Sequence, residues 1–114
     1  SEQDFDDVQV TAIETGNGSN VQQVLARFPV TEVVSLTGGS PTETISVSLT
    51  NRGLSTKPDV GFVECSTDPN IQASYDFDNA SNSSTVAYID LETMDGTNLH
   101  TGLQRFSIEF IEYL

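Results

Sequence analysis

The sequence predicts an all-β domain, an antiparallel β-sandwich of the jelly-roll type with about seven or eight strands. Apolar and polar residues alternate strictly over residues 44–50 and again over residues 71–78. This period places one set of side chains in a core and the other in water. Gly, Pro, Asn and Asp cluster between the alternating runs and mark turns. A length of 114 residues fits one domain, so we expect a single domain over residues 1–114, with residues 1–7 as a connector.

The N-terminal third contains one predicted strand and one ambiguous segment. Apolar residues alternate with polar ones over residues 7–14, which indicates a strand. Over residues 20–28 the apolar residues recur at helical spacing, with Asn20 as an N-cap and Pro29 as a stop. So short a run also fits a strand, and both a short helix near residues 20–28 and a strand remain open. A Val-rich strand over residues 32–37 follows.

Five further strands are predicted after the Gly-Gly-Ser-Pro turn. They cover residues 43–50, 58–65, 71–78, 84–93 and 104–113. Pro58 fits the first position of its strand, where no ladder hydrogen bond is lost. The last strand directs Phe106, Ile108 and Phe110 to the core, because these residues alternate with polar ones.

Apolar side chains also fall on the outer faces of the last two predicted strands. Ile111 and Tyr113 lie out of phase with the core positions of the last strand, and Val86 and Tyr88 do so in the strand before it. Exposed apolar groups of this kind usually mark an interface, and identical subunits usually assemble with closed symmetry. We therefore expect an oligomer.

The chain is strongly acidic, with 17 Asp and Glu residues against 4 Lys and Arg residues and a formal net charge of −13. Phosphate recognition needs clustered Lys and Arg, so this balance argues strongly against nucleic acid and equally against an anionic membrane surface. An oligomer contact must be nearly free of acids, or must use Arg27, Arg52 or Arg105 to offset them.

The sequence shows neither a membrane-spanning segment nor a signal peptide. No stretch approaches the ~20 apolar residues that cross a bilayer, so we expect no membrane insertion. The N-terminus has neither the basic region nor the apolar run of a signal peptide. Because the chain also lacks an initiating Met, we expect it to be a piece of a longer protein, and because the last predicted strand runs to Leu114, we expect a C-terminal piece.

Few residues offer catalytic chemistry. The chain has one His, His100, which we expect to be exposed in a loop, and one Cys, Cys65, which we expect to be buried at a strand end. A nucleophile needs a base that a third group positions, and no motif supplies that set. Carboxylate pairs of the kind used in glycoside hydrolysis are uninformative among so many acids. We therefore expect no enzyme and no catalytic residue.

The nearest thing to a metal site is an acidic hairpin loop after residue 75. Asp76 and Asp78, with Asn79 and Asn82 nearby, offer the oxygen ligands that Ca²⁺ takes, but without EF-hand spacing. The same residues are typical of turns, where their side chains bond to nearby backbone groups. We expect turn chemistry, no metal and no cofactor, with Ca²⁺ at Asp76 and Asp78 as the weaker alternative.

Several segments resemble the C-terminal domains of bacteriophage tail fibres and tailspikes. These segments are residues 46–65, residues 75–85, the Asp-Gly-Thr-Asn of residues 95–98 and the Arg-Phe-Ser-Ile-Glu-Phe of residues 105–110. The pattern of a Pro-led strand and a closing Phe-x-Ile-x-Phe strand is also similar to the small H-type lectin sandwiches. The likeness covers roughly residues 30–112, and no binding residue carries over individually.

The resemblance implies a homotrimeric β-sandwich at the tip of a phage tail fibre or tailspike, located in the virion tail. It implies recognition of the host surface through a bacterial glycan or protein receptor, together with trimer assembly. The alternative is a purely structural trimerisation cap of a polysaccharide depolymerase tailspike.

A receptor site is expected in the two longest polar loops, because binding residues favour loops held on a rigid scaffold. These loops are residues 79–83 and residues 94–102, which flank one predicted strand. The candidate ligand-binding residues are Tyr88, Asp76, Asp78, Asn79, Asn82 and Asn98. Tyr75 alternates in phase with core residues and is expected to be buried instead.

Overall fold

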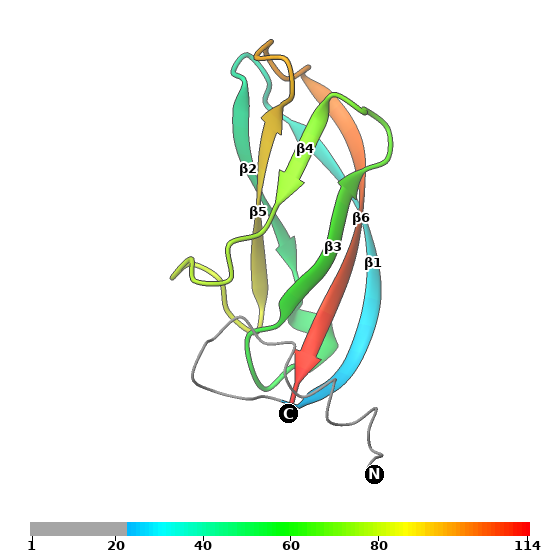
Figure 1. The fold of residues 1–114 in the computed structure, drawn as a ribbon, viewed down its shortest axis with the longest axis vertical. Coiled ribbons are helices and arrows are strands. Elements are labelled where there is room, and N and C mark those ends of the chain that lie inside the picture. Colours follow the sequence, from blue (N-terminus) through cyan, green and yellow to red (C-terminus); the bar gives the residue numbers. More distant parts are fainter. Residues whose placement is uncertain (1–22) are drawn as a thin grey trace, which may run out of the picture.

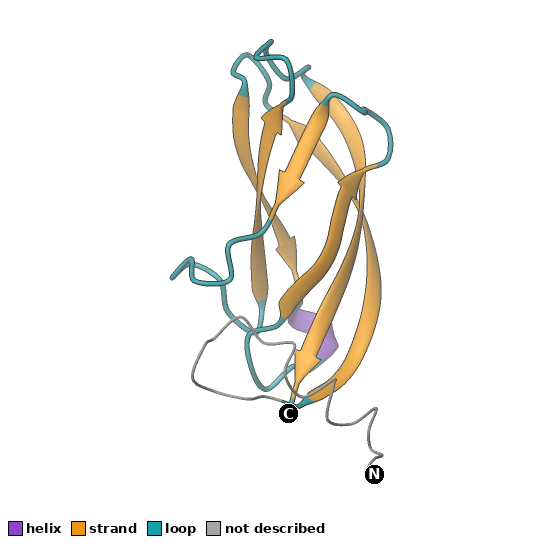
Figure 2. Ribbon diagram, in the orientation of Figure 1, coloured by secondary structure: helices purple, strands orange, loops and turns teal. Residues whose placement is uncertain are grey.

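The computed structural model describes residues 23–114, which form six strands and one 3₁₀ turn. The elements are β1 (Val24–Leu36), β2 (Thr42–Ser48), η1 (Thr50–Arg52), β3 (Asp59–Cys65), β4 (Ile71–Ser74), β5 (Val86–Thr93) and β6 (Gly102–Tyr113). The strands build two antiparallel sheets, ordered β1-β6-β3 and β2-β5-β4, which face each other as two layers (Figures 1 and 2).

The predicted all-β antiparallel sandwich is confirmed. β1 pairs with β6 in one sheet while β2 pairs with β5 in the other, so the chain winds as nested pairs, as in a jelly roll. β3 then joins β6 and β4 joins β5. The predicted strand over residues 7–14 and the connector over residues 1–7 lie outside the described residues.

β1 resolves the ambiguous N-terminal segment. The short helix near residues 20–28 is wrong for the described part of that range, because β1 runs without a break from Val24 through Pro29 to Leu36. β1 pairs with β6 along this whole length, apart from one irregularity between Val24 and Ala26. Since β1 is an edge strand, Pro29 can direct its missing donor away from the ladder. Tertiary pairing therefore overrides the helical spacing.

The other strands match the predicted ones with shifted ends. β4 is the largest difference, because it ends at Ser74 rather than at residue 78. Its pairing with β5 stops there, and the chain then turns away so that the Tyr75 hydroxyl donates a hydrogen bond to the Pro58 carbonyl at 2.8 Å. Tyr75 is partly buried against the core, as expected. Burial, followed by the charges of Asp59 and Asp76, raises the pKa of its hydroxyl.

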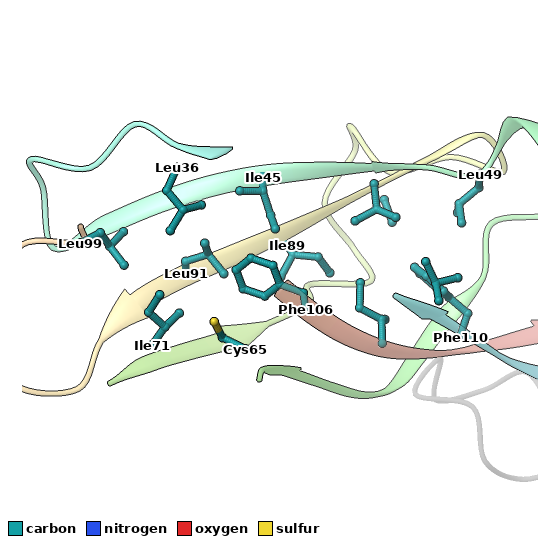
Figure 3. Packing of buried hydrophobic residues seen from close by; sticks show 14 residues of the cluster. Leu36, Ile45, Leu49, Cys65, Ile71, Ile89, Leu91, Leu99, Phe106 and Phe110 are labelled. Atoms are coloured by element: carbon teal, nitrogen blue, oxygen red, sulfur yellow. The ribbon is translucent and has the colours of Figure 1, made fainter. Parts of the chain in front are cut away.

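The inner faces of the two sheets form one hydrophobic core (Figure 3). Ile45 lies opposite Ile89 in the β2-β5-β4 sheet, and the Phe110 ring stacks on Phe28 at 5.5 Å in the β1-β6-β3 sheet. Cys65 is buried at the end of β3, as predicted. Each large apolar side chain buried in this way stabilises the fold by about 1.5–3 kcal/mol.

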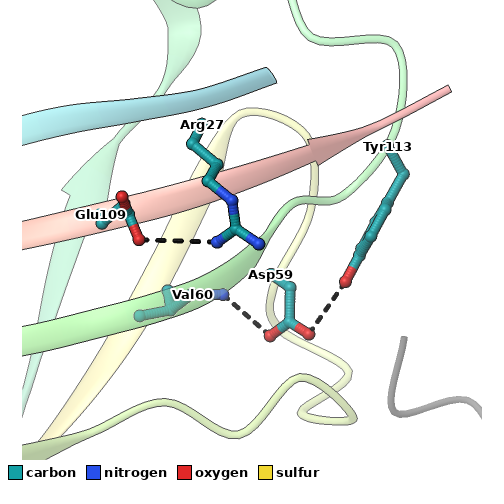
Figure 4. A network of polar contacts seen from close by, with 5 residues as sticks. All are labelled: Arg27, Asp59, Val60, Glu109 and Tyr113. Atoms are coloured by element: carbon teal, nitrogen blue, oxygen red, sulfur yellow. Dashed lines mark hydrogen bonds and ion pairs between the residues drawn. The ribbon is translucent and has the colours of Figure 1, made fainter. Parts of the chain in front are cut away.

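The expectation that Ile111 and Tyr113 are exposed is wrong, because they are only 6% and 2% exposed. The register of β3 against β6 slips between Val60 and Phe62, which leaves Gly61 as a bulge. A Cβ on Gly61 would lie 3.3 Å from the Ile111 side chain, so the absence of one makes room for that side chain. The Tyr113 hydroxyl donates to an Asp59 carboxylate oxygen at 3.3 Å (Figure 4).

The end of β6 is therefore covered on both faces within one chain, and its two outward apolar residues cannot serve an interface. Val86 and Tyr88, the other outward pair, are half-buried. The predicted oligomer loses Ile111 and Tyr113 from its argument, whereas Val86 and Tyr88 stay partly exposed.

Candidate functional site

The outer face of the β2-β5-β4 sheet is a flat grid of polar side chains. Ile45, Ile89 and Leu91 point into the core, so their strand neighbours point outward. The register sets Asp90 between Thr44 on β2 and Ser74 on β4. Glu92 lies in the same way between Thr42 and Gln72. Five of these six side chains end in a hydroxyl or a carboxylate, and Gln72 ends in an amide.

A shallow open depression of about 260 Å³ lies over this grid. Its lining residues are Thr42, Glu43, Thr44, Gln72, Ser74, Asp90, Leu91 and Glu92. The Thr44 hydroxyl donates to Asp90 at 2.9 Å, which fixes one carboxylate oxygen and leaves the rest of the carboxylate facing solvent. A close array of donors and acceptors on a rigid sheet suits a ligand rich in hydroxyl groups.

Glu43 lines the same depression but has another role. Its carboxylate accepts the backbone N–H groups of Thr37 and Gly38 at 2.8 and 3.1 Å. It therefore holds the connection between β1 and β2, and we do not assign it to ligand binding.

Tyr88 is the only predicted site residue on this grid. It lies two residues before Asp90 on the outer face of β5, opposite Ser46, and is half-buried. Two residues along a strand span about 7 Å, so its ring adjoins the depression without lining it. An aromatic ring beside polar groups can pack on the apolar face of a sugar.

Three of the four predicted residues of the acidic hairpin loop bond nearby backbone groups through their side chains, and Asp78 takes part through its backbone N–H. Asp76 accepts the backbone N–H of Asp78 at 3.0 Å, and Asn79 accepts that of Ser81 at 2.9 Å. Asn82 is 7% exposed, donates to the Asp76 carbonyl at 2.8 Å and accepts the Tyr88 N–H at 2.7 Å. These bonds support the turn reading over the calcium reading.

No ligand set for a metal is found among residues 23–114, in which three or more His, Cys, Asp or Glu side chains nowhere gather suitably. His100 is exposed, as expected, and lies in the loop between β5 and β6. The Cys65 sulfur lies 3.7 Å from the hydroxyl of Thr67 and from the amide oxygen of Gln104, so neither of its near polar neighbours is a base.

The two predicted receptor loops do not meet. Residues 79–83 precede β5 and project from the side of the sandwich, whereas residues 94–101 follow β5 and lie at one end of the sandwich (Figure 1). Asn82 bonds to Tyr88, and the strand from Tyr88 to Thr93 spans about 17 Å. Asn98 is exposed in the second loop, so it cannot share a site with Asp76, Asp78, Asn79 and Asn82.

The second loop is stiffened by its own hydrogen bonds. The exposed Asp95 carboxylate accepts the hydroxyl and the N–H of Thr97 and the amide of Asn70. These bonds, with the Thr97 hydroxyl as the largest cause, lower the pKa of Asp95 from 3.8 to about 2.

The sequence alone did not reveal the polar grid, because its residues become neighbours only through the order of the strands in the sheet. Its members are the polar halves of three alternating runs, which the sequence shows clearly. The runs of β2 and β4 share no obvious link, since both come together only through β5. A signal existed in the hydroxyl-rich composition of those halves.

By fold and by this face, the described part of the chain belongs to the class of jelly-roll-like β-sandwiches with a polar outer sheet face. Comparisons with known proteins found no matching family model, no matching curated protein and no matching solved structure. Within residues 23–114 no helix is long and apolar enough to cross a membrane.

Proposed function

We propose that this chain is a binding and assembly module, without enzymatic activity, of the kind found at the tips of phage tail fibres and tailspikes. It binds a glycan of the bacterial surface through the outer face of the β2-β5-β4 sheet, and it works as a homotrimer in the virion tail. The observation that carries the proposal is the grid of hydroxyl, amide and carboxylate groups around Asp90.

The chemistry of the grid favours one class of glycan. Asp90 and Glu92 are acidic, and no Lys or Arg lies on β2, β4 or β5. These two carboxylates would repel an acidic polysaccharide, because no basic side chain on the three strands offsets them. The ligand is therefore a neutral or amine-bearing sugar. Carboxylates accept pairs of sugar hydroxyls, while the neighbouring Thr44, Ser74 and Gln72 complete the hydrogen bonds.

The test is binding of the full chain to host cells and to an array of bacterial surface glycans. Asp90→Ala should weaken binding at least about tenfold, because a charge-assisted hydrogen bond is worth about 1.5–3 kcal/mol. The matched control is Asp78→Ala, which removes an exposed carboxylate from the loop between β4 and β5, outside both sheets. It should bind as the unchanged chain does, and both variants should keep their melting temperature.

Two outcomes contradict the proposal. If the chain binds neither cells nor any glycan and does not compete with phage adsorption, the structural trimerisation cap replaces it. If incubation with capsule or lipopolysaccharide releases oligosaccharides, the chain is an enzyme.

A further inference from the structure

The outer face of the β1-β6-β3 sheet differs from the polar grid in chemistry. Val33, Phe62 and Leu103 are 53%, 51% and 70% exposed on it. The register places Val33 opposite Arg105 and Phe62 opposite Glu109, while Leu103 lies two residues from Arg105 on the same face. Three large apolar side chains thus face water on one side of this sheet. No large apolar residue on β2, β5 or β4 is exposed in this way.

The charge of this face also differs from that of the chain. It carries Arg27 and Arg105 against Asp59, Glu64 and Glu109, so these five charges sum to −1, whereas the whole chain carries −13. Arg27 and Glu109 form an ion pair at 3.6 Å (Figure 4). The Arg105 guanidinium and the Glu64 carboxylate have no ion-pair partner among residues 23–114.

We propose that this face, the outer surface of β1, β6 and β3, is where copies of this chain bind one another. A second copy is the occupant because two strongly acidic chains repel least where their surfaces are neutral. A basic partner protein would instead be drawn to the acidic remainder of the surface. Arg105 of one copy then pairs with Glu64 of the next, beside the apolar contact of Val33 and Leu103.

The size of the face allows a small interface. The outer face of β6 is open from Gly102 to Glu109, because Ile111 and Tyr113 are buried; these eight residues are about 27 Å long, and three strands are about 15 Å wide. The projected area is about 400 Å² before side-chain relief, about half of the roughly 800 Å² per partner in stable interfaces. Packing this sheet inward leaves the polar grid of each copy facing outward and open to ligand.

This proposal rests on the homotrimer of the proposed function and names the face through which its three copies contact one another. Sedimentation equilibrium of the full chain at micromolar concentration should give the mass of three chains. Val33→Asp and Leu103→Asp should each reduce it to one chain, because a buried unpaired carboxylate is costly. The matched control is Ser46→Asp, which adds the same charge on the exposed outer side of β2 and should leave the assembly intact.

A charge exchange tests the pairing independently of folding. Arg105→Glu should dissociate the assembly, and Arg105→Glu combined with Glu64→Arg should restore it. Circular dichroism melting confirms that each variant is folded.

A single-chain mass for the unchanged protein up to about 100 µM would overturn the proposal, as would aspartate variants that stay assembled. A two-chain mass that falls to one in these variants supports the face but rejects the trimer. Glycan binding separates the two proposals, because the dissociated Leu103→Asp chain still presents its Asp90 grid, with lower avidity. Loss of binding by Asp90→Ala in an intact assembly tests the grid alone.

Discussion

At the scale of the residue, Asn82 organises one end of the sandwich. It is a buried polar side chain, and both ends of its amide are used. The nitrogen donates to the Asp76 carbonyl and the oxygen accepts the Tyr88 N–H. One side chain thus ties the loop after β4 to the backbone of β5, just beyond the residues of β5 that pair with β4. Asn82, which the sequence suggested as a ligand-binding residue, therefore has a structural role.

Asn82→Ala should lower the free energy of unfolding by about 1–3 kcal/mol, because it leaves the Tyr88 N–H without its acceptor, whereas the Asp76 carbonyl keeps the Asn79 N–H. Chemical denaturation measures this loss. Asn98→Ala is the matched control, since Asn98 is exposed, and it should change stability by less than about 0.5 kcal/mol. Equal effects of the two changes would refute the role of Asn82.

Asp95 gives a prediction at the same scale for pH. Folding lowers its pKa from 3.8 to about 2, so its hydrogen bonds stabilise the fold above pH 3.8 and the effect is lost as the pH falls toward 2. Thr97→Val removes the largest cause and should raise the pKa toward 3.8, as followed by carboxyl NMR. Thr56→Val, in an exposed loop, should leave it unchanged.

At the scale of the element, two connections at one end of the molecule behave as one unit. The loop between β1 and β2 bonds to the loop between β5 and β6 through Gly39 N–H to the Leu99 carbonyl at 3.1 Å and Leu99 N–H to the Ser40 carbonyl at 2.8 Å. The Thr101 hydroxyl adds a bond to the Thr37 carbonyl at 2.8 Å. Chain segments about 60 residues apart therefore close this end of the sandwich.

Gly38 and Gly39 offer a matched test of that closure. Both have positive φ, at 74° and 78°, so Ala at either position carries about 1–2 kcal/mol of strain. A Cβ on Gly38 would also lie 2.6 Å from the Thr101 nitrogen and 2.9 Å from the Leu99 carbonyl oxygen, whereas a Cβ on Gly39 would meet no atom within 4 Å. Gly38→Ala should therefore cost about 1–3 kcal/mol more than Gly39→Ala in denaturation. Equal costs would mean that the two loops do not pack as described.

At the scale of the whole molecule, charge and apolarity are divided between the two sheets. The β2-β5-β4 sheet presents acids and hydroxyls, and the β1-β6-β3 sheet presents nearly balanced charges with exposed apolar side chains. With a formal charge of −13, the carboxylates of the folded chain also repel one another. One sheet is thus suited to a polar ligand and the other to contact with a neutral surface.

Raising NaCl from about 10 mM to about 1 M shortens the screening length from about 30 Å to about 3 Å. The melting temperature should rise by several degrees, because screening reduces self-repulsion. Measurement in the Leu103→Asp variant separates this effect from assembly. A melting temperature that falls with salt would show that attractive ion pairs dominate.

The sequence by itself determined the fold class and most of the strands. Alternation assigned Ile45, Ile89 and Phe106 to the core correctly, because a period of two is a local property that each strand carries alone. The burial of Cys65 and the exposure of His100 followed from local context in the same way.

Tertiary structure alone decided the rest, because those features depend on which strands become neighbours. Pairing with β6 carried β1 through Pro29, and the bulge at Gly61 buried Ile111. The length of β5 separated the two receptor loops, and the order β2-β5-β4 gathered the polar grid. Pairing partners lie far apart in the chain, so no local pattern encodes which face of a strand will meet which neighbour.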